Sequence, residues 1–383
     1  MREDTLSFRC SIVRGGTSKG LFLRENELPP PGELRDKIIL KLLGSPDARQ
    51  IDGLGGANSL TSKVCIIGPS QREGMDVDYT FGQVSVDKAK IDWQGNCGNL
   101  SAAVGIYAVD KNYVKATELY TDVQVFNTNT NKHLKVRVPV KDGRAVSEGD
   151  YAIPGVPGTG AKLRVEFFDP AGGVTGKLLP TGNPKDVIDL GEKGKFTLSV
   201  VDSVTPVVYL LAHELGLAGT ELPTQVEGMP EVLALMEELR SHAAVLAGIV
   251  KRKEDATEHS PAFPKVGFVS APRDYVNPEG KLVKAEEVDL VARLGSMQKM
   301  HRAYMIGGAV STGAAATIPG TVIWDVMRPE ARGKETLLIG QPYGAMEVDI
   351  YREDGKITCE GVYRTARLLM DGIAYIPRAC LEL

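Results

Sequence analysis

Short apolar runs alternate with turn-forming residues along most of the chain, a pattern typical of strands joined by tight turns. Apolar residues at helical spacing occur in only a few segments, among them 34–42 and 232–239. Two segments rich in small residues, 95–108 and 307–320, predict short helices that could thread a strand-lined interior. The pattern therefore indicates a sheet-rich α+β protein.

The predicted elements occur twice in the same order. In each half an apolar strand leads through the tripeptide E-L-P, at Glu27 and again at Glu221, into an amphipathic helix. The run KVCIIGP from Lys63 is echoed by KVGFVSAP from Lys265, and a small-residue helix follows each of them. Two copies of one strand–helix unit are the simplest account, although short apolar strands also resemble one another by chance.

We expect two pseudo-symmetric domains, residues 1–192 and 196–383, separated in the polar turn GEKGK. The strand after Arg367 either stays in the second domain or returns to the first. If the N-termini of the two small-residue helices face one cleft, their free N–H groups and positive dipole ends form an anion site suited to carboxylates.

Composition supports many turns and limits the partners. The chain has 42 glycines and 22 prolines but only 6% aromatic residues. A net charge of -4 provides no broad basic face for nucleic acid. Because no stretch of about 18 apolar residues and no signal-peptide pattern occurs, we expect a cytoplasmic protein that does not bind membranes. Its expected partner is a small molecule, and a homo-oligomer is left open.

Several kinds of catalytic site lack their sequence signatures. The five cysteines form neither a CxxC pair nor a closely spaced framework, so we expect free thiols rather than disulfides or zinc. The pair His213-Glu214 is not a zinc-protease motif, because Leu217 stands where HExxH requires its second histidine. No GxSxG motif indicates a serine hydrolase. Metal and Ser-His-Asp catalysis are therefore disfavoured.

Cys97 lies in GNCGN, directly before the apolar helical stripe of Leu100, Val104 and Tyr107. The flanking glycines let the backbone approach a ligand closely. A helix N-terminus favours the thiolate, so this thiol could accept or return a proton near neutral pH. The alternative is a buried cysteine that only packs in the cap region, and both interpretations stay open.

Lys63 follows GLGGANSLTSK and precedes the apolar run VCII, so it stands where a strand begins. A lysine that has lost its hydration can act as a base, whereas a charged lysine binds carboxylate. The alternative is a solvated lysine at a strand end.

The segment RGGTSKG, residues 14–20, places two small hydroxyls and three glycines ahead of a strand. Such a segment can wrap a carboxylate, although a glycine-rich hairpin turn has the same composition. It is not a P-loop, because Lys19 is followed by Gly20 rather than by Ser or Thr opening a helix. The segment GLGGAN likewise lacks the Rossmann fingerprint.

Taken together, the ordered motifs resemble the PrpF-type isomerases, from about Arg9 to Arg364. The motifs are RGGTSKG, DGLGGANSLTSK, GNCGN, LLPTG, SPAFPK and AAATIPGTV. This family includes methylitaconate, methylaconitate and aconitate isomerases and 4-oxalomesaconate tautomerases, and SPDARQIDG and DVDYTF are most similar to the 3-methylitaconate delta-isomerases. The resemblance implies a diaminopimelate-epimerase-like fold of two pseudo-symmetric domains, each a strand barrel around a central helix.

The resemblance also implies the site. Lys63 and Cys97 would be the acid/base residues, and Ser311, Thr312 and Gly313 would supply the opposite helix terminus. The groups that hold substrate carboxylates would be Gly16, Thr17, Ser18, Asn58, Gly98 and Asn99. Related epimerases carry a second cysteine at the start of the second central helix, but this stretch reads GGAVSTG. A proton shift by lysine and cysteine is therefore favoured over a two-cysteine racemase.

The expected function is a cofactor-free isomerase that shifts a proton, and with it a double bond, in a small unsaturated di- or tricarboxylic acid. Cis–trans isomerisation of such an acid is included. Which of Lys63 and Cys97 abstracts the proton stays open. The alternatives are an amino-acid epimerase on the same fold and a non-catalytic carboxylate-binding protein.

Overall fold

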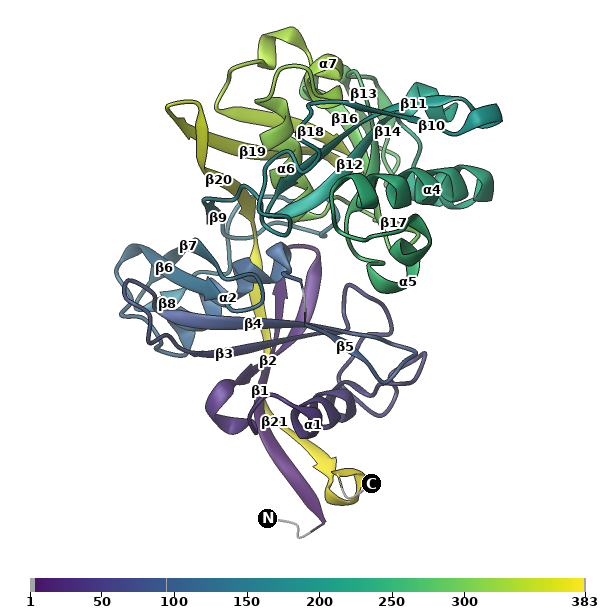
Figure 1. The fold of residues 1–383 in the computed structure, drawn as a ribbon. Coiled ribbons are helices and arrows are strands. Elements are labelled where there is room, and N and C mark those ends of the chain that lie inside the picture. The colour runs from purple at the N-terminus through teal and green to yellow at the C-terminus, as the bar shows by residue number, and fades with distance from the viewer. Residues whose placement is uncertain (1–3, 94, 382–383) are drawn as a thin grey trace. The chain divides into compact units, whose positions relative to one another are not determined.

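The computed structural model describes residues 4–93 and 95–381 of the 383-residue chain (Figure 1). The chain forms two compact units. Unit 1 comprises Met1–Glu166 and Tyr363–Leu383, and unit 2 comprises Phe167–Val362. Each unit is a strand barrel with one buried helix. Among the helices of the described residues, none is long and apolar enough to cross a membrane.

Unit 1 carries most of its sheet in the first half of the chain. Its helices are α1 (Glu33–Leu43) and α2 (Gly98–Asp110). Its strands are β1 (Thr5–Gly15), β2 (Ser18–Arg24), β3 (Lys63–Pro69), β4 (Val77–Val84), β5 (Ile91–Asp92), β6 (Leu119–Asn127), β7 (Lys132–Lys141), β8 (Arg144–Ala145), β21 (Ala366–Pro377) and β9 (Leu163–Phe168), whose last two residues lie beyond the division between the units.

The strands of unit 1 surround α2. Antiparallel pairs join β1 to β2, β3 to β4 and β6 to β7, while β2 runs parallel to β3 and β4 parallel to β6. Every residue of α2 from Asn99 to Val109 is buried, as expected of a helix that is apolar on all sides. Small side chains make this possible: a Cβ at Gly105 would lie only 2.4 Å from Val136 Cγ1.

Unit 2 contains more α-helices than unit 1 among the described residues. Its helices are α3 (Pro223–Glu227), α4 (Pro230–Leu246), α5 (Ala256–His259), α6 (Ile306–Ala316) and α7 (Val322–Val326). Its strands are β10 (Asp186–Asp189), β11 (Lys195–Ser203), β12 (Thr205–Leu211), β13 (Lys265–Ser270), β14 (Tyr275–Val276), β15 (Leu282–Val283), β16 (Leu290–Ser296), β17 (Lys299–Met300), β18 (Thr336–Gln341), β19 (Gly344–Glu353) and β20 (Lys356–Arg364), whose end lies beyond the division.

Unit 2 repeats the strand pairing of unit 1 around α6. Antiparallel pairs join β11 to β12, β13 to β16 and β18 to β19, and parallel pairs join β12 to β13 and β16 to β18. The parallel pairs are connected through helices in both units, as a crossover between parallel strands requires. The strands that begin at Lys63 and Lys265 occupy equivalent places. The pseudo-symmetric α+β fold expected from the sequence is confirmed.

The chain divides at residues other than 192 and 196. The turn GEKGK lies inside unit 2, where it connects the antiparallel strands β10 and β11. Leu190 N–H donates to the Gly194 carbonyl, closing this hairpin. A polar, glycine-rich turn is needed as much within a hairpin as between domains, so its composition does not mark a boundary. The strand after Arg367 pairs with β1 in unit 1.

A carboxyl group is enclosed in the interior of unit 2. Glu360 on β20 has no exposed surface, and the Ser203 hydroxyl donates a 2.6 Å hydrogen bond to its Oε2. A Cβ at Gly313 in α6 would lie 2.8 Å from Glu360 Oε1, so the carboxyl packs directly against the central helix. Burial raises the pKa of Glu360 to about 8.

Glu360→Gln tests this buried acid. The folded state holds the proton up to about pH 8, whereas the unfolded chain releases it near pH 4.5. The wild type should therefore lose stability as the pH rises between these values, by on the order of 3 kcal/mol from pH 5 to pH 8. The variant, neutral throughout, should lack this loss in urea unfolding. Glu353→Gln, at the exposed end of β19, is the matched control; equal pH dependence in both variants would contradict the assignment.

Candidate active site

The N-terminus of α2 is the first component of the site in unit 1. The helix begins at Gly98, with Cys97 in an extended conformation at the N-cap (φ -112°, ψ 95°). The Cys97 side chain forms no capping hydrogen bond, while its carbonyl accepts one of 2.9 Å from Ser101 N–H. The half-buried thiol therefore lies beside the free N–H groups and the positive end of the helix dipole.

The turn between β1 and β2 meets this helix end. Gly16 lies in the left-handed region (φ +51°), where glycine is favoured. Ser18 Oγ lies 3.9 Å from Cys97 Sγ, and Asn99 Nδ2 donates a 3.0 Å hydrogen bond to Thr17 Oγ1. The segment RGGTSKG is thus a tight hairpin turn and also part of the cluster around Cys97.

Arg364 contacts the same helix end, although it belongs to the C-terminal segment of unit 1. Its Nε donates a 3.1 Å hydrogen bond to Asn99 Oδ1, and this bond fixes which way the Asn99 amide faces. Arg364 is 6% exposed, and burial lowers its pKa to about 10. An arginine at this value remains charged at neutral pH, so the end of α2 carries a buried positive charge.

Lys63 is the first residue of β3 and only 7% of its surface is exposed. Its Nζ donates a hydrogen bond to Gln83 Oε1, directly across on β4, and lies 5.2 Å from the centre of the Phe81 ring. Among the described residues Lys63 forms no ion pair. It is therefore a buried lysine with a neutral hydrogen-bond partner, not the solvated strand-end lysine of the alternative interpretation.

Cys65 shows that Lys63 and Cys97 lie in one neighbourhood. Burial raises the pKa of the Cys65 thiol well above its usual value; the nearby Cys97 raises it further, while Lys63 lowers it. Cys65 Sγ lies 3.9 Å from the Tyr79 hydroxyl, which in turn accepts a hydrogen bond from the Cys97 backbone. Lys63 and the Cys97 thiol at the end of α2 thus act on the same buried group.

Asn58 lies near these residues, but its side chain forms hydrogen bonds within its own loop. Its Nδ2 donates to the Gly56 carbonyl at 3.0 Å, and its Oδ1 accepts from Leu60 N–H at 2.9 Å. The Leu60 carbonyl accepts a 3.0 Å hydrogen bond from Lys19 N–H, which places the loop beside the start of β2. Asn58 therefore shapes the loop in this structure, and its exposed side chain holds no other group of the cluster.

The residues expected at the second helix terminus lie elsewhere. The helix α6 begins at Ile306, so Ser311, Thr312 and Gly313 are inside it and buried, and the expectation that they form its N-terminus is wrong. The Ser311 hydroxyl donates to the Ser203 carbonyl at 2.8 Å, and Thr312 to the Gly308 carbonyl at 2.7 Å. Small polar residues in sequence look like a cap, but here Ser311 bonds the central helix to its own barrel and Thr312 bonds back within the helix.

The residue that corresponds to Cys97 in the second unit is Met305. Each directly precedes its buried central helix as the N-cap. A thioether has no exchangeable proton, so it cannot serve as the second acid/base group of a two-cysteine racemase. The structure thus supports the sequence-based choice against that chemistry.

Three members of the cluster were missed from sequence. Gln83 could have been found from the pairing of β3 with β4, which places it opposite Lys63. Tyr79 reads as an ordinary inward-facing strand residue, since it is fully buried. Arg364 stands 265 positions from Asn99, and only the returning strand β21 brings it near.

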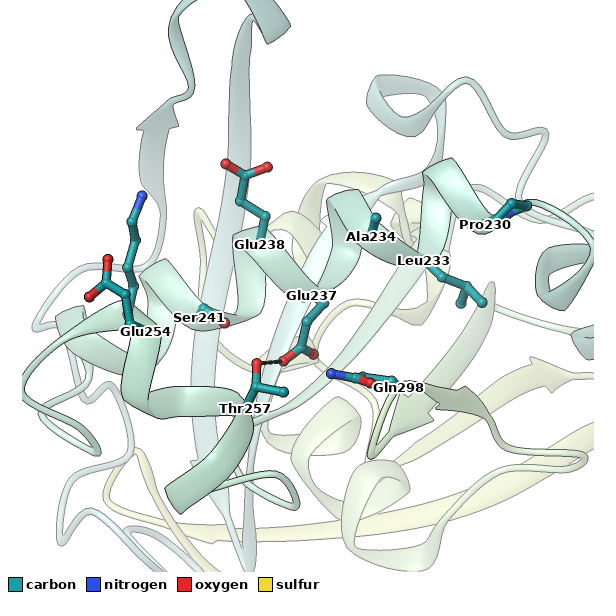
Figure 2. A pocket seen from close by; sticks show the side chains of 10 residues that line it. Pro230, Leu233, Ala234, Glu237, Glu238, Ser241, Glu254, Thr257 and Gln298 are labelled. Atoms are coloured by element: carbon teal, nitrogen blue, oxygen red, sulfur yellow. Dashed lines mark hydrogen bonds between the residues drawn. The ribbon is translucent and has the colours of Figure 1, made fainter.

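A separate hollow of about 670 Å³ lies on unit 2, between α4 and α5 (Figure 2). Glu237 faces it, but this carboxylate accepts hydrogen bonds from Arg240 at 2.6 Å and from Thr257 at 2.6 Å. None of the residues predicted to form the site lines this hollow. Glu237 is occupied by neighbouring side chains and Glu238 pairs with Lys193, so the chemistry is better sought at α2.

A strand barrel around a buried central helix, present twice in one chain, is the fold of the epimerases. The solved structure of a hydroxyproline epimerase from Agrobacterium vitis shares this fold, with a TM-score of 0.52 at 13% identity over 97% of this chain and 93% of that one. The chain belongs to the PrpF family, whose model, described as PrpF protein, matches residues 6–377.

The relatives in this family are isomerases. The chain is 46% identical to the 3-methylitaconate isomerase of Eubacterium barkeri over 380 residues, which cover 99% of this chain and 100% of the relative. It is 39% identical to the 2-methyl-aconitate isomerase of Shewanella oneidensis, covering 96% of each. A crystal structure of methylitaconate-delta-isomerase matches with a TM-score of 0.87 at 46% identity, covering 99% of this chain and 98% of that one. The chain is an isomerase, and the resemblance seen in the sequence is confirmed.

Gly16→Ala tests the close approach of the β1–β2 turn to α2. A Cβ at Gly16 would lie 2.1 Å from Asn99 Oδ1, in addition to the strain of a positive φ. We expect a loss of roughly 3 kcal/mol in the free energy of unfolding. Gly74→Ala is the matched control, since Gly74 has φ +74° with nothing within 4 Å of its Cβ; it should lose only about 1 kcal/mol. Equal losses would show that strain alone matters.

Proposed function

We propose that this isomerase moves a proton, and with it a double bond, along a small unsaturated di- or tricarboxylic acid. The observation that carries the proposal is that buried Cys65 has both Lys63 and Cys97 near enough to affect its pKa, with Cys97 at the N-cap of α2. Two groups that can exchange protons thus lie near one buried thiol, and one of them, Cys97, lies beside free backbone N–H donors. The relatives named for methylitaconate and methyl-aconitate support an acid of this kind.

The first requirement of the reaction is to hold a carboxylate. The free N–H groups at the start of α2 and the hydroxyls of Thr17 and Ser18 are suitable donors. Buried Arg364 adds positive charge at the same end of unit 1. Because a carboxylate next to the reacting carbon takes up the developing enolate charge, these groups act more strongly in the transition state than before it.

The second requirement is a base for a weak carbon acid. In our mechanism the Lys63 amine removes the allylic proton, so that the C–H bond breaks, an N–H bond forms and the electron pair moves into the carboxylate as a dienolate. The dienolate then takes a proton at the far carbon, from the Lys63 ammonium or from the Cys97 thiol. No electron is gained or lost overall. Each well-aimed donor to the dienolate is worth roughly 3 kcal/mol of the barrier.

The first acid to test is 3-methylitaconate, followed by methylaconitate, aconitate isomers, itaconate and oxalomesaconate. The alternative of an amino-acid epimerase is weakened by Met305 in the place where a second thiol would stand.

We also propose that the enzyme works in the cytoplasm, because all five cysteines are free.

Lys63→Ala and Cys97→Ala test the assignment by proton NMR in D2O with this panel. The wild type should introduce deuterium and move the double bond in one acid. Lys63→Ala should lose roughly 1000-fold or more of this rate, since general-base catalysis contributes on that scale. Cys97→Ala should lose at least about tenfold.

Matched controls in unit 1 are Lys37→Ala, on the surface of α1, and Cys10→Ala, in the apolar core. Both should keep the wild-type rate. Full activity of Lys63→Ala would refute the role of Lys63. Tight binding of an acid without any exchange by the wild type would identify a carboxylate-binding protein instead.

A further inference from the structure

Gln83 lies between Lys63 and the loop that precedes it. The antiparallel pairing of β3 and β4 places the two residues directly opposite each other. Gln83 Nε2 donates to the Ser62 carbonyl at 3.0 Å and to the Ser59 carbonyl at 3.2 Å, while its Oε1 accepts from Lys63 Nζ. One side-chain amide thus joins the lysine to the loop.

The contacts of the amide fix its orientation. The carbonyls of Ser59 and Ser62 can only accept hydrogen bonds, so the NH2 group of Gln83 must face them. Its oxygen is then left to face Lys63, whose amine donates. A flipped amide would set two donors against Lys63 and an acceptor against two carbonyls, losing all three bonds.

The chemical consequence follows from the charge of this partner. An amide oxygen accepts a hydrogen bond from an ammonium or from a neutral amine, whereas a carboxylate would strongly favour the ammonium. Among the described residues no acid pairs with Lys63, and the Phe81 ring at 5.2 Å is the other group that contacts its charge. A neutral anchor therefore directs the lysine while favouring its proton much less than a carboxylate would.

We propose that Gln83 is the positioning residue of Lys63, which it aims and ties to the 59–62 loop while leaving the amine free to act as a base. This inference rests on the proposed function, since it assumes that Lys63 is the base. Gln83 acts through Lys63 and is not itself assigned a contact with substrate.

Gln83→Glu and Gln83→Met shift the proton affinity of Lys63 in opposite directions. The carboxylate of Gln83→Glu stabilises the ammonium, so the acidic limb of the kcat/KM profile moves to higher pH and activity at pH 7 falls at least tenfold. Methionine removes the acceptor at similar size, so the limb moves to lower pH and the maximal kcat falls because the amine is no longer aimed. KM for the acid should change less than kcat in both variants.

Gln124→Glu is the matched control, the same change at a half-buried strand residue of unit 1 that pairs with His133. It should leave the profile unmoved. If both Gln83 variants fold, as judged by circular dichroism and urea unfolding, yet lower activity with no movement of the limb, Gln83 has a structural role only and the inference is overturned.

A readout without substrate separates this inference from the proposed function. The Cε carbon of Lys63 can be followed by NMR in 13C-lysine-labelled enzyme, with its signal assigned by Lys63→Arg. The titration midpoint should rise in Gln83→Glu and fall in Gln83→Met. Opposite shifts in an enzyme that isomerises no acid would refute the proposed function while keeping the effect of Gln83 on Lys63. Unchanged midpoints in a Lys63-dependent isomerase would refute the inference alone.

Discussion

Burial of a helix inside a strand barrel is the constraint on which both units depend. Such a helix must be thin, because the strands leave little room, and it must satisfy its polar groups within its own barrel. In α2 the first demand is met by small residues such as Gly105, whose Cα faces Val136. In α6 the second is met by Ser311, which bonds to the strand ends of its unit. The N-terminus of the buried helix then carries free N–H groups on a rigid support, which is why the chemistry gathers around Cys97.

The sequence predicted the larger features well, because they follow from periodicity. Strands that begin at Lys63 and Lys265, and the small-residue helices after them, were found from short apolar runs and from their repetition. Such patterns show within a short window which face of a segment is apolar and therefore buried. Lys63 and Cys97 were also found, because glycine-rich surroundings and a helix start are visible in a short window. Their role in catalysis remains a proposal.

What the sequence could not supply were contacts between distant segments. The turn GEKGK has the composition of a linker, yet pairing of β10 with β11 makes it a hairpin. Ser311 and Thr312 look like capping residues, yet the helix starts earlier, at Ile306. The sequence around Gln83 and around Arg364 does not mark them as site residues, because the role of each depends on which residue lies opposite it in the fold. In each case the missing information is a strand register or a helix start that only the folded barrel defines.

The return of β21 to β1 has a consequence for how the protein is made. During synthesis on the ribosome all of unit 2 is complete before β21 appears, so it can fold while unit 1 still lacks an edge. The bond between Arg364 and Asn99 is therefore among the last to form. A nascent chain from which β21 has not yet emerged has its lysine and thiol but not the arginine beside them, so the charged cluster is assembled only after unit 2 has been synthesised.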